Sequence, residues 1–357
     1  MKEKKFCAIV FGCVMLGLLM FAAPIIVVDP YFHYHAPLKK IFYTINNERY
    51  QNNGISKHFE YDAMITGTSM TENFRTSELD DLFNVKSVKV PYNGGRYKEI
   101  SKNMLVALEN NRNIQMIVRA VDYTGLILDK DDEDHEARED YPHYLNDENI
   151  FNDVNYIFNK EVFRLSIEAL GYLGIKNGHT SFDDYANWNK AAVYGKDAVL
   201  STYNPGVIDD SVKNISLSEK EKEMIKGNVY QNIVSIAEKY PEVDFYIFFP
   251  PYSVCWWGEL KSEGKIEYQV EAEEVTIKEL LKSDNIKLYS FSDNFEWTCN
   301  LDNYKDQAHY GEWINSAILE AIYKGEHLIT EDNYEEYLDR IKDFYSNYDY
   351  NELYSDK

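Results

Sequence analysis

The hydrophobic pattern divides the chain into an apolar N-terminal segment and a long region where short apolar runs alternate with amphipathic ones. The run from Phe6 to Val28 has 23 residues and no charged side chain. About 20 apolar residues suffice for a helix to cross roughly 30 Å of hydrocarbon. Lys2, Lys4 and Lys5 precede the run and Asp29 follows it. This pattern predicts a single transmembrane anchor with a cytoplasmic N-terminus and an extracytoplasmic remainder.

A cleaved signal peptide is the alternative interpretation of the same segment. The best candidate cut follows Ala23, but Phe21 is bulky where a small residue is required, and Pro24 comes directly after the cut. A lipoprotein cut before Cys13 would leave too short an apolar stretch ahead of it. An uncleaved anchor in the cell membrane is therefore favoured.

After the anchor, the pattern alternates between two kinds of element. Short apolar runs bounded by turn formers predict five buried strands, at Ala63–Thr66, Val88–Val90, Ile114–Val121, Val243–Phe249 and Ile286–Phe291. Amphipathic segments predict helices at Arg96–Glu109, 218–239, Val270–Leu281 and Gly311–Tyr323. Ser218 and Glu221 form a capping-box pattern at the start of the second helix. This alternation predicts an α/β domain with a parallel sheet covered on both faces.

We expect three regions along the chain. Residues 1–29 form the cytoplasmic tip and the anchor, 30–60 an aromatic and polar juxtamembrane stalk, and 61–357 one globular domain. The gap between the third and fourth strands is too long for a simple crossover, so about 125–215 is interpreted as an insertion or lid. Its acidic run, Asp131 to Asp140, is interpreted as solvated surface.

Charge and cysteine content narrow the possible partners. Lys and Arg total 37 against 60 acidic residues, for a net charge of −23. Such a surface repels nucleic acid and anionic headgroups, so neither is an expected partner. Cys255 and Cys299 are the only cysteines outside the anchor. They are expected either to form a disulfide or to remain free.

The candidate chemistry comes from residues that follow the predicted strands, because ligands bind beyond the carboxyl ends of parallel strands. The segments that follow them are Gly67-Thr68-Ser69-Met70, Pro91-Tyr92-Asn93-Gly94-Gly95, Asp122, Pro250-Pro251-Tyr252 and Asp306-Gln307-Ala308-His309. All five are expected at one edge of the sheet.

Together these residues suit nucleophilic catalysis. Ser69 on a tight turn after the first strand is the candidate nucleophile, with His309 as its base and Asp306 orienting the imidazole. Ser69, Asn93 and Gly94 are the candidate donors to an oxyanion. Asp132 and His135 repeat the Asp-x-x-His spacing, but they lie in the acidic run and follow no strand. This chemistry requires neither a metal ion nor a cofactor.

Four further residues are candidate substrate-binding positions. Arg119 lies near the end of the third strand, Tyr252 follows the fourth, and Trp256 and Trp257 come shortly after. A cation beside aromatic rings would suit a sugar that carries an anionic group. The alternative is that Arg119 pairs with a carboxylate and that the tryptophans pack in the core.

The serine after the first strand and the Asp306-x-x-His309 motif before the last helix resemble the SGNH/GDSL hydrolase superfamily. The anchor, the Gly67-Thr68-Ser69 block and Asp306-x-x-His309-Tyr-Gly-x-Trp313 resemble its extracytoplasmic branch, typified by the D-alanine transfer protein of teichoic acid modification and the alginate O-acetyltransferases. The resemblance covers roughly residues 60–325. It implies a three-layer α/β/α, flavodoxin-like (SGNH-type) fold and a Ser69–His309–Asp306 triad. Hydrolases of the superfamily carry an oxyanion asparagine after the third strand, where this chain has Arg119-Ala120-Val121-Asp122.

The resemblance implies serine-dependent transfer of an acetyl or D-alanyl group to a cell-surface glycopolymer, or its removal. It also implies a multi-spanning membrane acyltransferase as partner. Two other interpretations remain open: a non-catalytic polysaccharide-binding or scaffold protein that uses the same cleft, and an esterase acting on small substrates.

Overall fold

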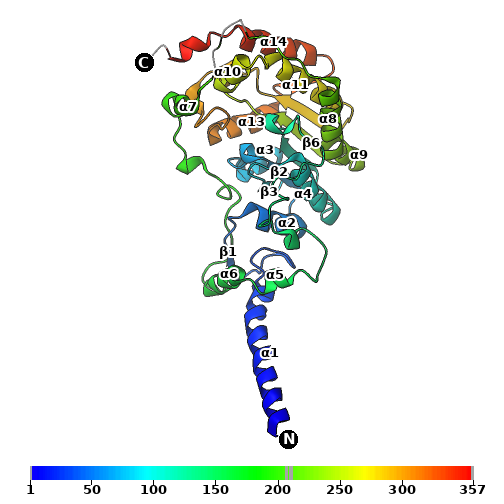
Figure 1. Ribbon diagram of the computed structural model, residues 1–357, viewed down its shortest axis with the longest axis vertical. Coiled ribbons are helices and arrows are strands. Elements are labelled where there is room, and N and C mark those ends of the chain that lie inside the picture. The colour runs from blue at the N-terminus through cyan, green and yellow to red at the C-terminus, as the bar shows by residue number, and fades with distance from the viewer. Residues whose placement is uncertain (1, 206–207, 209–211, 355–357) are drawn as a thin grey trace.

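The N-terminal segment is one long helix that projects from the rest of the molecule. In the computed structural model, which describes residues 2–205, 208 and 212–354, helix α1 (Lys2–Val28) forms the stem in Figure 1. It is long and apolar enough to cross a membrane. Residues 3–20 are exposed along the whole length of the stem.

A mostly parallel six-stranded sheet forms the centre of the globular part. Its strands are β2 (Ala63–Gly67), β3 (Ser87–Pro91), β4 (Met116–Ala120), β6 (Asp244–Phe249), β7 (Ile286–Ser290) and β8 (Leu328–Ile329), in the order β3-β2-β4-β6-β7-β8. The first five pair in parallel, and β8 pairs antiparallel with β7. The five predicted strands are confirmed. At two residues, β8 is too short to give a recognisable pattern.

The strands are continuously hydrophobic because both faces of the sheet are covered. Every residue of β2, β3 and β4 is buried, and a strand covered on both sides needs a continuous apolar run instead of an alternating one. The mixed α/β class with a mainly parallel sheet is therefore as predicted.

Helices of the globular part connect and cover the strands. They are α2 (Glu48–His58), α3 (Thr76–Phe83), α4 (Tyr97–Asn110), α5 (Val154–Ile157), α6 (Lys160–Gly171), α7 (Lys196–Thr202), α8 (Glu219–Val229), α9 (Ser235–Lys239), α10 (Val254–Ser262), α11 (Ile266–Leu280), α12 (Phe295–Thr298), α13 (Glu312–Lys324) and α14 (Tyr334–Asn347). The four predicted helices are present, and the capping box of Ser218 and Glu221 opens α8. A π-helical stretch, Tyr230–Val234, separates α8 from α9.

The segment 30–60, expected to be a stalk, is largely packed against the globular part. Helix α2 contacts α4 and β3, and its residues 51–56 are buried. The side chain of Gln51 donates to the carbonyls of Pro30 and Thr44, at 3.1 and 3.0 Å, and that of Asn52 donates to Pro91 O at 2.5 Å. The buried residues of α2 are mostly polar, so hydropathy does not reveal their burial.

Residues 125–215 form helices at both ends of the globular part. Helices α5 and α6 lie beside α1 at the lower end of the globular part, whereas α7 lies near its top (Figure 1). Strand β5 (Gly178–His179), between them, pairs in parallel with β1 (Phe42–Tyr43). The division of the chain into domains stays a prediction.

Cys255 and Cys299 are free thiols. Burial raises the pKa of Cys255 to about 12 and that of Cys299 to about 11. Both thiols therefore stay protonated and weakly nucleophilic at neutral pH.

Candidate active site

A tight turn directly after β2 presents Ser69. Gly67 has φ +150°, and a Cβ there would lie 2.7 Å from Thr71 Cγ2 and 3.2 Å from Ala120 Cβ. Glycine is therefore needed where the chain leaves the sheet. Ser69 opens the 3₁₀ turn Ser69–Thr71, and Thr68 Oγ1 accepts a hydrogen bond from the N–H of Met70 at 3.4 Å.

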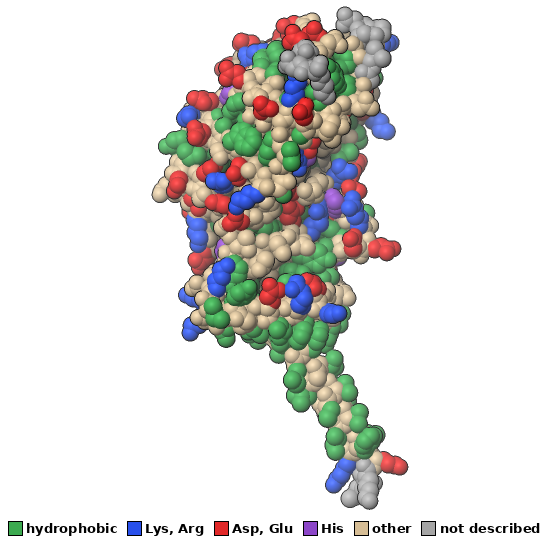
Figure 2. All heavy atoms as spheres, turned by 90° about the vertical axis from the view of Figure 1, so that its left-hand side faces the viewer, with side chains coloured by type: hydrophobic (Ala, Val, Ile, Leu, Met, Phe, Trp, Pro, Cys, Tyr) green, Lys and Arg blue, Asp and Glu red, His purple; other side chains and the backbone are tan. Residues whose placement is uncertain are grey.

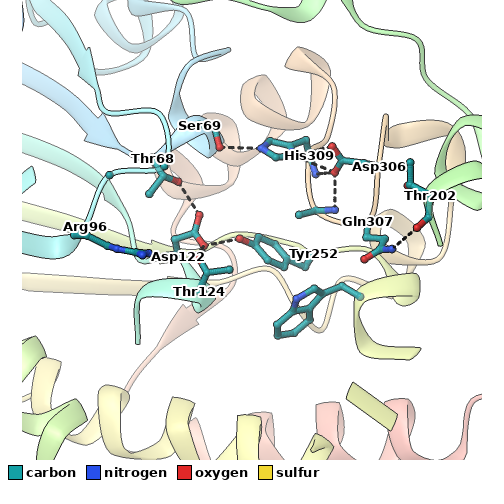
Figure 3. A pocket seen from close by; sticks show the side chains of 14 residues that line it. Thr68, Ser69, Arg96, Asp122, Thr124, Thr202, Tyr252, Asp306, Gln307 and His309 are labelled. Carbon is teal, nitrogen blue, oxygen red and sulfur yellow. Dashed lines mark hydrogen bonds and ion pairs between the residues drawn. The ribbon is translucent and has the colours of Figure 1, made fainter. Parts of the chain in front are cut away.

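His309 and Asp306 come from the loop before α13, at the same edge of the sheet. His309 Nε2 lies 2.8 Å from Ser69 Oγ. His309 Nδ1 lies 3.0 and 2.9 Å from the two carboxylate oxygens of Asp306. Figure 3 shows the three side chains in line. The expected serine–histidine–aspartate contact is thus present, over a separation of 240 residues.

The Asp306 carboxylate is held ionised by its own turn. Its Oδ1 accepts the backbone N–H groups of Ala308 and His309 at 3.0 and 2.8 Å. Burial is the largest single influence and opposes ionisation. The hydrogen bonds and charge of His309, with these two N–H groups, outweigh it and lower the pKa of Asp306 to about 2. The carboxylate can therefore fix the imidazole tautomer that leaves Nε2 facing Ser69.

Two backbone N–H groups are available beside Ser69. Within the described residues, neither the N–H of Ser69 nor that of Gly94 donates a hydrogen bond in the chain, and both residues line one cavity. Gly94 has φ +61°. Gly95 also lines the cavity, but its N–H donates to Tyr92 O at 2.7 Å. Ser69 and Gly94 therefore remain candidate oxyanion donors.

Asn93, the third predicted oxyanion donor, directs its hydrogen bonds to two carboxylates. Its N–H donates to Glu48 Oε2 at 2.6 Å, and its side-chain amide donates to Glu72 Oε1 at 2.9 Å. Asn93 does not line the cavity, because these two carboxylates turn its donors away from Ser69.

Asp122 lies shortly after the end of β4 and lines the cavity. Its carboxylate accepts the hydroxyls of Thr68, Thr124 and Tyr252 at 2.7, 2.8 and 2.5 Å, and the N–H of Thr124 at 3.2 Å. Burial, with the charge of Asp122, raises the pKa of Tyr252 well above its usual range, so the phenol stays a donor. This region therefore holds a carboxylate surrounded by donors and offers no amide N–H₂ to an oxyanion.

The cavity beside the triad has a volume of about 430 Å³. Its lining residues come from the segments that follow β2, β3, β4 and β6, from α7 and α10, and from the loop before α13. They are Thr68, Ser69, Gly94, Gly95, Arg96, Asp122, Thr124, Thr202, Tyr252, Trp256, Asp306, Gln307, Ala308 and His309 (Figure 3).

The four predicted substrate-binding residues are not all near this cavity. Tyr252 and Trp256 line it, and Trp256 stacks on Tyr123 with ring centroids 5.1 Å apart. Trp257 is buried and stacks on Tyr345 at 4.2 Å. Trp257 therefore belongs to the core, because consecutive helical residues point in different directions.

Arg119 is also placed away from the cavity. Its guanidinium is fully buried, donates to Ser101 Oγ and Asn232 O at 3.1 and 2.8 Å, and lies 5.5 Å from the centre of the Tyr97 ring. Burial lowers the pKa of Arg119 to about 10. No carboxylate pairs with Arg119 in the part of the chain that the structure describes. Its hydrogen bonds tie β4 to α4 and to the π-helical stretch.

Several site residues were not singled out from the sequence. Trp188 meets the His309 ring edge-on at 5.6 Å, and its backbone N–H donates to Asn73 Oδ1 at 3.1 Å. Gln307 donates its amide to Thr202 O at 3.2 Å. The aromatic stretch around Trp188 was the available signal for the part of 125–215 that reaches the site.

The second Asp-x-x-His pair, Asp132 and His135, makes contacts outside the triad. Asp132 forms an ion pair with Arg96 at 3.3 Å, and His135 lies against Gly94. In the part of the chain that the structure describes, no group of three or more His, Cys, Asp or Glu side chains is arranged to hold a metal ion.

Comparisons with known proteins add little to this geometry. No protein-family model matches the chain, and no curated protein matches it in sequence. A solved structure described as "a putative platelet activating factor from Streptococcus pneumonia" aligns with a TM-score of 0.37 and 10% identity, covering 78% of this chain and 90% of that one.

Proposed function

We propose that the protein catalyses serine-dependent O-acyl chemistry at the extracytoplasmic face of the membrane, moving an acetyl or D-alanyl group onto or off a cell-surface glycopolymer. The observation that carries the proposal is the continuous hydrogen-bonded line from Ser69 through His309 to Asp306. A half-buried carboxylate, an oriented imidazole and a serine on a sharp turn are the parts that nucleophilic catalysis needs.

In the first step, His309 Nε2 takes the proton of Ser69 as Oγ bonds to the acyl carbon. The carbonyl oxygen becomes an oxyanion that the N–H groups of Ser69 and Gly94 can receive. Collapse breaks the bond to the donor oxygen, which leaves with the proton from His309, and the acyl group remains on Ser69. An acceptor hydroxyl then loses its proton to His309 as its oxygen bonds to the acyl carbon. The bond between that carbon and Ser69 Oγ breaks, and His309 returns the proton to Oγ, which regenerates Ser69.

Transfer is favoured over hydrolysis by the nature of the oxyanion region. Removing one oxyanion donor typically lowers kcat by about 10²–10³-fold. Here the segment that follows β4 has Asp122 and no asparagine, and the charge of that carboxylate disfavours a nearby oxyanion. A reactive acyl donor and a sugar hydroxyl held close to Ser69 would compensate for weak oxyanion stabilisation. A multi-spanning membrane acyltransferase would supply such a donor.

The finer fold assignment is part of the same proposal. Numbered along the chain, the five parallel strands lie in the order 2-1-3-4-5, which is the flavodoxin-like order. The order reverses between β2 and β4, and Ser69 and Asp122 follow these two strands. This supports a three-layer SGNH-type domain with the ligand at the switch point, on an anchor whose N-terminus is cytoplasmic.

A non-catalytic polysaccharide-binding protein is the second candidate. The observation that favours it is again Asp122, because a carboxylate beside the expected oxyanion is poorly suited to catalysis. In that case Trp256, Tyr252 and the hydroxyls around Asp122 would bind sugar without turnover.

Reaction with a fluorophosphonate probe tests the proposal. Such probes form a covalent bond only with an activated serine, so the full-length protein in detergent should be labelled, and Ser69→Ala and His309→Ala should not. Ser253→Ala is a matched control, since Ser253 is buried and its hydroxyl donates to Gln307 O at 2.7 Å. Absence of labelling in the wild-type protein would favour the binding protein instead.

A further inference from the structure

The outer end of α1 is held on one side by two helices of the segment 125–215. The Phe21 ring stacks on Phe163 of α6 with centroids 4.5 Å apart, and on Phe158 at 6.2 Å. Ile25 is fully buried against Tyr156 and neighbouring residues, in a small core separate from the main one. The anchor is thus packed into the globular part.

The chain is also fixed where it leaves α1. The Asp29 carboxylate accepts the backbone N–H groups of His33, Tyr34 and His35 at 3.0, 2.7 and 3.0 Å, and the hydroxyl of Tyr156 at 2.7 Å. Asp29 itself has φ +52°. A buried carboxylate with four donors holds this turn in one conformation. It ties the end of α1 to residues 33–35 and to Tyr156 of α5.

Around this junction, α5, the turn before it, and α6 expose apolar side chains. The most exposed is Phe151, at 86%, followed by Ile150 at 74%; the other members of this set, named the collar, are Val154, Phe158 and Ile167. Ile167 lies one turn after Phe163, on the same side of α6. Figure 2 shows hydrophobic side chains gathered on the underside of the globular part, around the point where α1 emerges. Apolar patches of this kind mark protein or membrane contacts.

The length of the anchor indicates what covers the collar. The stretch Phe6–Met20 is exposed throughout, but at about 1.5 Å per residue it spans roughly 22 Å, short of the roughly 30 Å of a hydrocarbon core. The remaining thickness falls on Phe21–Val28, where Ile26 and Val27 are still 44% and 56% exposed. Because α6 packs on Phe21, a bilayer that covers the whole apolar run also reaches the collar.

We propose that the collar is a second membrane contact, which sinks into the leaflet at the outer end of α1. Its partner is the boundary between headgroups and acyl chains, where apolar faces of surface-lying helices are buried by about 5–10 Å. The exposed stretch of α1 is shorter than the hydrocarbon core by about 8 Å, which falls in that range. The contact is apolar, so it does not depend on anionic lipids, which the net charge of −23 would repel.

The consequence is a fixed height for the cavity. With α1 joined rigidly at Asp29 and the collar in the leaflet, the globular part can neither swing freely on its anchor nor lift away from the bilayer. The Ser69 cavity is then presented to molecules that extend a set distance from the membrane, such as a lipid-anchored polymer. The membrane contact itself does not depend on the proposed chemistry.

Fluorescence quenching in vesicles tests the proposal on the full-length chain. Cys7, Cys13 and Cys299 are replaced by serine, and the buried Cys255 is kept. A bimane label is then placed at Phe151→Cys or Ile150→Cys, and the protein is reconstituted into phosphatidylcholine vesicles. The matched control is Val193→Cys, an apolar position 75% exposed in the stretch between Trp188 and α7.

At 151 and 150, the label should lose most of its emission to phosphatidylcholine carrying a doxyl group near the carbonyls, and should resist aqueous iodide. The label at 193 should show the reverse. If the collar labels respond as the label at 193 does, the membrane contact is wrong. Protection from iodide without quenching by the doxyl lipid would mean that a second copy of the chain covers the collar, which also overturns the proposal. Neither measurement uses catalytic activity.

Discussion

At the scale of single residues, some predicted site residues line the cavity and others are buried in the core. Ser69, His309 and Asp306 face one another in the cavity. Arg119 and Trp257, which looked like ligand contacts, are buried structural residues. The carboxylate of Asp122 accepts four hydrogen bonds, from Thr68, Thr124 and Tyr252.

The triad should act as a unit. Ser69→Ala should lower kcat/KM for an activated acetyl ester by on the order of 10⁴-fold, and adding His309→Ala should cost little more, because groups that act together are not additive. The free energy of unfolding should change by less than about 0.5 kcal/mol in Ser69→Ala, since little packing is lost. Multiplicative losses in the double variant, or unfolding of Ser69→Ala, would indicate a structural serine.

Asp306 should impose a pH dependence on stability. Its pKa of about 2 in the folded protein lies below the ordinary value of about 3.9, so between these pH values the unfolded chain binds more protons. The stabilisation is therefore complete above about pH 4 and is lost as pH falls through about 2. The difference in thermal midpoint between wild type and Asp306→Asn should shrink from pH 6 to pH 2.5. A difference that does not change with pH would contradict this.

At the scale of elements, α2 links the membrane-proximal segment to the candidate oxyanion loop. Glu48 accepts the N–H of Asn93, Arg49 donates to Asn93 O at 2.9 Å, and Asn52 donates to Pro91 O. Arg49 is itself fixed by Glu99 at 2.9 Å. Three residues of one helix thus hold the loop that carries Gly94 after β3.

Arg49 should therefore be a positioning residue. Arg49→Met should lower kcat by roughly tenfold and change KM by less than about twofold, because a displaced oxyanion donor weakens the transition state more than the ground state. Steady-state kinetics with an activated ester would measure this. Arg340→Met is the control, since Arg340 pairs with Asp293 on the surface and does not line the cavity. Equal effects of the two variants would show only general destabilisation.

At the scale of the whole molecule, one segment of the chain packs against the anchor and also reaches the candidate active site. The segment 125–215 contributes α5 and α6 beside α1, and then Trp188 and Thr202 beside His309 and Gln307. The anchor end and the site are therefore joined through packed segments.

Asp29 should control the rigidity of that joint. Asp29→Ala removes the acceptor of four hydrogen bonds, and each hydrogen bond to a charged group is worth about 1.5–3 kcal/mol. Amide exchange at residues 31–35 should accelerate by at least about tenfold, measured by hydrogen–deuterium exchange of the protein in nanodiscs. Exchange within β4 should stay unchanged and serves as an internal control. Unaltered exchange at 31–35 would show that packing alone holds the junction.

The sequence by itself determined the features that depend on apolar periodicity. An uncharged run of 23 residues identifies the helix that can span a membrane. Five buried parallel strands are visible because strands covered on both faces must be continuously apolar. Ser69 could be selected because it directly follows a strand, and parallel strands end at a common edge. Asp306 and His309 could be selected because they lie between the last predicted strand and the last predicted helix.

Tertiary structure alone decided where polar residues are buried and which of two neighbours faces the cavity. Helix α2 and Arg119 are buried because carbonyls and hydroxyls far along the chain accept their hydrogen bonds. Trp256 lines the cavity while Trp257 lies in the core, and Gly94 faces the site while Asn93 is turned away by Glu48 and Glu72. Local periodicity records the burial of apolar surface, whereas a polar group is buried only where distant segments bring it a partner.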